Sequence, residues 1–230
     1  MLPGDALVPD AASIVMHAVT IAAPVERVWP WLAQMGAGRA GWYSYDWVDN
    51  GGTPSATRII PGLQHPAPGD VMPSLPGEKD SFIVGIVDPG HDLVLTVPVS
   101  GGGLLVSWEF YLMPVAPRST RLLVRGRLSP RWPAAGAGKG GSSPRPIERI
   151  YALLARVPRW LMVPAARFGH GMMQARQLRG IKKRAEAARR SEGGPQRQPA
   201  TPQSTARPMT RPVLDVSLRR LDWQFPPSPC

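Results

Sequence analysis

The sequence is almost without cysteine, because its single thiol, Cys230, is the last of 230 residues. One thiol per chain excludes an internal disulfide, a cysteine-based zinc site and a buried cysteine nucleophile. No uninterrupted apolar run reaches the ~18 residues that a membrane-spanning helix needs. Residues 1–10 lack the basic and apolar regions of a signal peptide. We therefore expect a cytoplasmic protein that contains no disulfide.

The chain also lacks the spacing patterns of metal and nucleotide sites. Its four histidines include no i, i+3 or i+4 pair that would converge on a metal ion. Residues 36–41 and 136–141 both read G-x-G-x-x-G, but neither segment follows a strand and opens a helix, as dinucleotide binding requires. We expect no metal and no cofactor.

Acidic residues are few: 16 Asp and Glu stand against 27 Lys and Arg, which gives a net charge of +11. Residues 182–230 hold ten of the basic residues and four of the acidic ones, so the C-terminal part carries more than half of the excess. A basic chain attracts nucleic acid or an anionic membrane, or it simply carries solvated arginines. We favour solvated arginines and expect no nucleic-acid binding by the folded body.

Apolar periodicity is the main positive signal in the first half of the chain. Residues 13–22 alternate and are rich in β-branched side chains, which predicts a strand. Residues 24–36 have helical spacing, and Pro30 inside them should kink or split the helix. Residues 81–88 and 92–99 predict two further strands.

The clearest hairpin is centred near Pro117. This centre places Phe110 opposite Val124, an apolar pair. It also places Glu109 opposite Arg125, a pair of opposite charges. We expect the apolar face to point inward and the charged face to be solvated.

The last part of the chain divides into a linker, an amphipathic segment, a helix and a tail. Residues 129–146 are a low-complexity linker, and residues 147–163 are apolar on one side and basic on the other. Pro164 opens a long helical pattern. Its apolar stripe consists of Phe168, Met172, Ala175, Leu178, Ile181 and Ala185. Residues 191–230 are rich in proline and arginine and cannot bury a core, so we expect a disordered tail.

This order of elements predicts an α+β domain over residues 11–190, with residues 129–163 inserted before the last helix. The apolar faces of the sheet and the helix are both buried if the sheet curves around the helix. The segment 147–163 then either covers a sheet edge or makes peripheral contact with a membrane.

Three segments carry a resemblance to a known family. The three segments are residues 19–32, which include Ala-Pro between strand and helix, residues 41–47 (Gly-Trp-Tyr-Ser-Tyr-Asp-Trp) and residues 177–186. They resemble segments of the SRPBCC superfamily of START-like and polyketide cyclase/dehydrase-like proteins. The resemblance covers roughly residues 13–190. It implies a helix-grip fold, in which a curved antiparallel β-sheet wraps around a long C-terminal helix and encloses a hydrophobic cavity. It implies no single reaction, because this fold serves cyclases, hydrolases, carriers and receptors.

The aromatic run after Gly41 is the best candidate site. Tyr43, Tyr45 and Asp46 would orient the polar end of an apolar ligand, and Trp42 would supply a flat apolar wall. A buried Asp46 needs a partner, which Arg39 or Tyr45 would provide. In the alternative interpretation, the same side chains fill a corner of the cavity and Asp46 caps the following turn.

Three residues outside this run extend the predicted ligand site: Trp108, Phe110 and Met172. Each is either a wall of the cavity or an ordinary core residue. His170, beside the stripe of the last helix, is either a catalytic base or a half-buried helix histidine.

Three functions follow as hypotheses. The first is binding or carriage of a small hydrophobic ligand, such as a lipid or a polyketide-like molecule, between the sheet and the last helix. The second is a cyclase/dehydrase-like enzyme that uses Asp46, Tyr43 or His170 for acid/base catalysis. The third is an interaction module that uses the basic tail. We favour the first, without catalysis.

Overall fold

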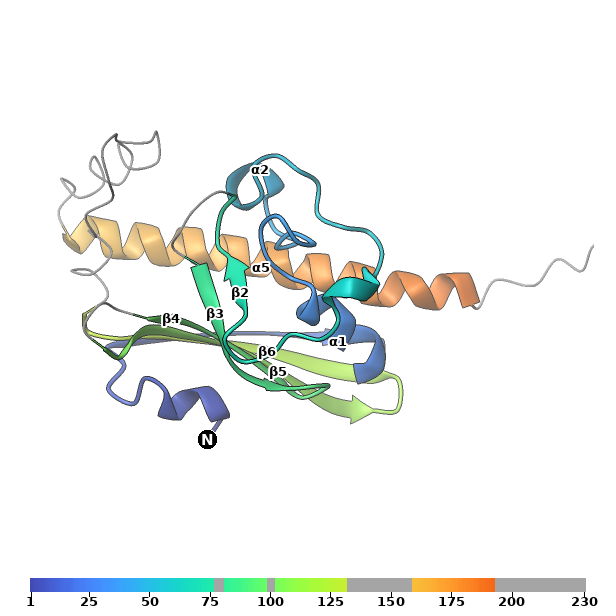
Figure 1. Cartoon of the computed structure of the whole chain (residues 1–230), viewed down its shortest axis with the longest axis horizontal. Coiled ribbons are helices and arrows are strands. Elements are labelled where there is room, and N and C mark those ends of the chain that lie inside the picture. Colours follow the sequence, from blue (N-terminus) through green and yellow to red (C-terminus); the bar gives the residue numbers. More distant parts are fainter. Residues whose placement is uncertain (77–80, 99–101, 132–158, 193–230) are drawn as a thin grey trace, which may run out of the picture. The chain divides into compact units, whose positions relative to one another are not determined.

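Six antiparallel strands form one sheet in the order β1-β6-β5-β4-β3-β2 (Figure 1). The strands are β1 (Ser13–Ile21), β2 (Val71–Pro73), β3 (Ser81–Asp88), β4 (Asp92–Pro98), β5 (Leu104–Ala116) and β6 (Ser119–Leu128). Strands β2 to β6 follow one another as a meander, and β1 pairs with β6 at the far edge. The chain between β1 and β2 must therefore cross from one edge of the sheet to the other.

The structure, a computed structural model, describes residues 1–76, 81–98, 102–131 and 159–192, with side chains described over residues 168–187 of the last segment. These segments belong to one unit, Met1–Gly194. None of the described helices combines the length and the apolar character that crossing a bilayer requires. Most of the predicted linker and of the segment 147–163, and nearly all of the predicted tail, lie outside the described residues.

The helices lie on the two faces of the sheet (Figure 1). They are η1 (Pro3–Ala6), α1 (Val25–Ala33), α2 (Asp46–Asp49), η2 (Pro61–Leu63) and α5 (Arg159–Glu192). The long helix α5 runs over one face, where it contacts α1 and β1, and η1 packs against β4 and β5 on the opposite face. The predicted α+β class and the sheet wrapped around a C-terminal helix are confirmed.

The hairpin of β5 and β6 has the predicted register. Phe110 pairs with Val124 and Glu109 pairs with Arg125. Both members of the apolar pair are buried in the core. Strand β5 ends at Ala116 and β6 begins at Ser119, on either side of the predicted centre near Pro117.

The charged face of this hairpin was predicted to be solvated; this is confirmed for Arg121, which is exposed, and wrong for Arg125 and Arg127. Glu109 is 1% exposed, because the N-terminal segment covers it and the Gly4 amide donates to its Oε1. Arg125 and Arg127 both pair with Asp5, at 2.6 and 3.3 Å. Burial raises the pKa of the Glu109 carboxyl. The sheet is therefore covered on both faces, and residues before the predicted domain start at residue 11 supply one of the covers.

The two proline-containing helices also differ from the prediction. The first, α1, is a single helix that continues through Pro30 and ends at Ala33. The last, α5, begins at Arg159 instead of Pro164. Each proline is the sixth residue of its helix, where it removes one backbone hydrogen bond without ending the helix.

The buried face of α5 is only half of the predicted stripe. Leu178, Ile181 and Ala185 are buried, but Phe168 is 70% exposed and Met172 is 47% exposed. Two glutamines occupy the buried face in their place: Gln174 accepts from Trp108 Nε1 at 3.1 Å and donates to Gln177 Oε1 at 2.7 Å. The interior between the sheet and the helix thus contains a satisfied polar pair as well as apolar side chains.

Gly180 of α5 lies against the loop after α1, and the missing side chain allows the close contact. A Cβ added at Gly180 would overlap the Tyr43 carbonyl oxygen and lie 2.9 Å from the Tyr43 Cβ. Arg184, one turn later, lies over the Tyr43 ring at 4.6 Å from its centroid and donates to the Ala56 carbonyl at 2.7 Å. These contacts fix α5 against the loop.

We predict that Gly180→Ala lowers the free energy of unfolding by about 1–3 kcal/mol, because the added methyl group forces α5 away from Tyr43. Helix propensity alone would give the opposite sign, since alanine is favoured over glycine by about 1 kcal/mol in a helix. Urea unfolding of both proteins measures the difference. Gly169→Ala is the matched control, since a Cβ there meets no heavy atom within 4 Å, and it should stabilise. A Gly180→Ala protein as stable as the Gly169→Ala protein would contradict the close contact.

Candidate functional site

Four aromatic rings of the predicted site region pack against one another. Trp42 lies 5.5 Å from both Phe82 and Trp108, and Trp108 lies 4.9 Å from Phe110, measured between ring centroids. Trp42 is 4% exposed and Phe110 is fully buried, and Trp42 Nε1 donates to the Ser74 carbonyl. At this position, the rings fill the space between the sheet and the loop.

Tyr43 is held from several sides. Its φ of +60° is unusual for a residue with a side chain and costs about 1–2 kcal/mol. Its amide donates to Ser55 Oγ, and its hydroxyl accepts from Gln34 Nε2 at 2.9 Å. Burial raises the pKa of Tyr43 to about 12, so its hydroxyl keeps its proton at neutral pH.

The glycines before Tyr43 build a small closed loop. Gly36 and Gly41 exchange both backbone hydrogen bonds, and both have positive φ values. A side chain at Gly41 would collide with Ser55, so this position requires glycine. Arg39 turns back and donates to the carbonyls of Met35 and Ala33, at 2.9 and 3.2 Å, which caps the C-terminal end of α1. The prediction that Arg39 or Tyr45 binds Asp46 is therefore wrong in this structure.

Asp46 uses both carboxylate oxygens on Ser55: one accepts from the Ser55 amide at 3.0 Å and the other from its hydroxyl. Nearby Asp49 is 5% exposed, and its Oδ1 has no hydrogen-bond partner. Burial, reinforced by the negative charge of Asp46, raises the pKa of Asp49 to about 6. The two carboxylates hold the turn around α2 together at an electrostatic cost.

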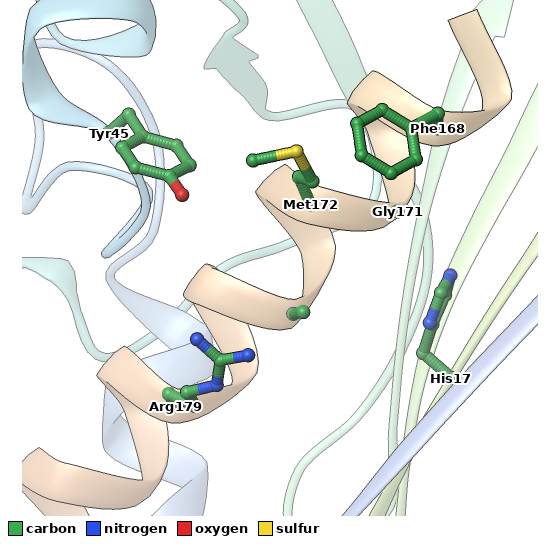
Figure 2. Close-up of a pocket in the computed structure, with 7 residues that line it drawn as sticks. His17, Tyr45, Phe168, Gly171, Met172 and Arg179 are labelled. Carbon is green, nitrogen blue, oxygen red and sulfur yellow. The ribbon is translucent and has the colours of Figure 1, made fainter. Parts of the chain in front are cut away.

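A groove of about 400 Å³ lies beside this packed region, between α5, β1 and the loop before α2 (Figure 2). Its lining residues are His17, Tyr45, Phe168, Gly171, Met172, Ala175 and Arg179. Figure 2 shows Phe168, Met172 and Arg179 along α5, with Tyr45 pointing toward Met172 from the loop and His17 on β1. The groove is open to solvent and mostly apolar.

Two of the seven residues predicted to bind a ligand, Tyr45 and Met172, line the groove. The other five lie in or beside the packed aromatic region: Trp42, Tyr43, Asp46, Trp108 and Phe110. Neither His17 nor Arg179 was among the predicted site residues. His17 shares the inward face of β1 with Val15 and Val19, and Arg179 follows Phe168, Met172 and Ala175 at helical spacing, so both positions carried a signal.

Two imidazoles meet next to the groove. The rings of His17 and His170 lie 6.4 Å apart, and the His170 ring lies 6.5 Å from Trp108. His17 lines the groove, whereas His170, an exposed residue next to Gly171 on α5, does not. Desolvation of its ring, together with the charge of His17, lowers the pKa of His170. Within the described part of the chain, no three His, Cys, Asp or Glu residues come together as a metal site would need.

Comparison with known proteins finds similarity in structure and not in sequence. No family model and no curated protein sequence matches the chain. The Zhui aromatase/cyclase of a Streptomyces species is 20% identical, over 79% of this chain and 98% of its own, with a TM-score of 0.40. A protein of Mesorhizobium loti is 16% identical, over 76% and 98%, with a TM-score of 0.39. A polyketide-cyclase-like protein of Corynebacterium glutamicum is 15% identical, over 78% and 83%, with a TM-score of 0.31.

The strand order and the position of α5 themselves define the fold. A six-stranded antiparallel sheet carries α1 and the long C-terminal α5 on one face. The chain has a helix-grip fold.

We predict that Asp49→Asn raises the free energy of unfolding at pH 8 by about 1–3 kcal/mol, since one pKa unit corresponds to about 1.4 kcal/mol. The folded-state pKa of about 6 lies above the unfolded value, so the folded state binds more protons between these values. The stabilisation that comes from proton binding by Asp49 in the folded state is therefore present at low pH, and it is lost as the pH rises from about 4 to above 6. Urea unfolding at pH 4 and pH 8 measures it.

The exposed Asp10 supplies the control, because Asp10→Asn removes the same charge without a buried carboxylate. Asp49→Asn should flatten the pH dependence of stability, and Asp10→Asn should leave it unchanged. An Asp49→Asn protein that is less stable than the wild type at pH 8 would contradict the assigned cost.

Proposed function

We propose that this protein binds a small hydrophobic ligand, for storage or carriage, in the groove formed by α5, β1 and Tyr45. One observation carries the proposal: large apolar side chains surround the groove and remain exposed. Phe168 is 70% exposed and Met172 47%, and Trp47, whose ring packs against that of Tyr45, is 77% exposed. Contiguous apolar surface of this kind is typical of a binding site.

The size and the rigidity of the groove support the proposal. Its volume of about 400 Å³ lies within the range of small-molecule sites, roughly 300–1,000 Å³. Its walls are tied down, because Arg176 lies 5.6 Å from the centroid of the Tyr45 ring and Ser44 Oγ donates to the Met173 carbonyl. A groove that is already formed loses little conformational entropy when a ligand binds.

We predict that Gly171→Leu weakens binding of Nile red, a neutral apolar dye, by at least about ten-fold, the ratio that corresponds to 1.4 kcal/mol. A Cβ at Gly171 would meet His17 at 3.9 Å, an ordinary contact, so the leucine fills the groove without disturbing the fold. Fluorescence titration measures the affinity. Gly169→Leu, on the same helix but away from the groove, should bind like the wild type. A wild-type protein that binds no dye, or two variants with equal affinity, would contradict the proposal.

The second candidate is an enzyme of the cyclase/dehydrase kind, and the two imidazoles beside the groove are what favour it. Asp46 is bound to Ser55 and Tyr43 is bound to Gln34, so neither is free to move a proton. His170 has a lowered pKa, which would keep it neutral and able to accept a proton at pH 7. In this proposal the catalytic pair is His17 and His170.

We predict that His170 titrates below the ordinary histidine pKa of about 6.5 and that His17→Asn shifts its titration upward. The second effect follows because the variant removes the positive charge that disfavours protonation of His170. NMR titration of the imidazole signals measures both. A His170 titration at or above the ordinary histidine value would remove it as a neutral base.

A further inference from the structure

The groove is not uniform along its length. Phe168, Met172 and Ala175 line one end, and Arg179 lines the other. With a rise of 1.5 Å per residue, the apolar part extends over roughly 10 Å and Arg179 lies roughly 16 Å from Phe168 along the helix axis. The lining therefore matches a ligand with an apolar body and a polar end.

Among the residues that the structure describes, the side chain of Arg179 has no ion-pair or hydrogen-bond partner. Two neighbouring basic residues of α5 are occupied: Arg184 donates to two carbonyls of the loop, and Lys182 donates to the Thr20 carbonyl and pairs with Glu186. The guanidinium of Arg179 is thus available to a ligand.

The charge around this end of the groove is positive. Arg176 stands over the Tyr45 ring at the rim, and no Asp or Glu belongs to the lining. In the neighbouring loop, Asp46 accepts hydrogen bonds from Ser55. An anionic group would bind here without meeting a carboxylate, and a guanidinium offers it two parallel donors.

On these grounds we propose that the ligand is an amphipathic anion, whose apolar body lies on Phe168, Met172 and Ala175 and whose carboxylate or phosphate end binds Arg179. This inference rests on the proposed function of the groove. It adds the chemical class of the ligand.

Calorimetry with three ten-carbon probes tests the inference: decanoate, decan-1-ol and decyl phosphate. Wild-type protein should bind decanoate about ten-fold more tightly than decan-1-ol, the ratio that one charge-assisted hydrogen bond of about 1.4 kcal/mol produces. Arg179→Gln should remove this preference and leave the affinity for decan-1-ol unchanged. A larger Arg179-dependent gain for decyl phosphate would support the inference with a phosphate as the anionic end.

Lys183→Gln is the matched control, because Lys183 is exposed on the same helix and does not line the groove. It removes the same charge and should leave all three affinities unchanged. Equal binding of decanoate and decan-1-ol to the wild type, or equal weakening of decanoate by both variants, would overturn the inference while the proposed function stands. Failure of every probe and of Nile red to bind would overturn the proposed function itself.

Discussion

The contact of α5 with the loop at Gly180 is the constraint on which the rest of the structure depends. Without a side chain at residue 180, the helix backbone reaches the Tyr43 carbonyl, and Arg184 then covers the Tyr43 ring and binds the carbonyls of Ser55 and Ala56. These bonds fix the C-terminal half of α5 in a close-packed interior, where a displacement would cost many contacts at once. The helix face around Phe168 and Met172 remains exposed, and the groove lies along it.

The packed aromatic region and the groove have different roles. Tyr43 is held in a strained backbone conformation by bonds to Ser55 and Gln34, as a residue that sets the shape of a loop must be. Tyr45, two residues later, is not part of this hydrogen-bond network and lines the groove. One short segment thus anchors the loop to α5 and also contributes to the site, which explains why its composition alone fits both interpretations.

The strands and their register could be predicted because each depends on a local pattern. Alternation placed β1, β3 and β4 within a residue or two, and pairing about one turn placed Phe110 opposite Val124. The face of α5 could not be predicted in the same way. Helical spacing favours Phe168 and Met172 as buried residues, but Gln174 and Gln177 are buried beside Leu178 instead. The reason is that Trp108, 66 residues before Gln174 along the chain, supplies a hydrogen-bond donor.

The sequence by itself determined the α+β class and the register of the β5–β6 hairpin, because apolar periodicity and turn residues act over short distances. The helix-grip arrangement was expected from the family resemblance. Tertiary structure alone decided that Arg39 caps α1, that Asp5 and Gly4 cover the charged face of the sheet, and that His17 and Arg179 share a groove. Each of these outcomes depends on hydrogen-bonding, burial or contact between residues that are brought together only when the sheet and α5 pack. Periodicity is a property of single segments, so it does not predict contacts between residues of different segments.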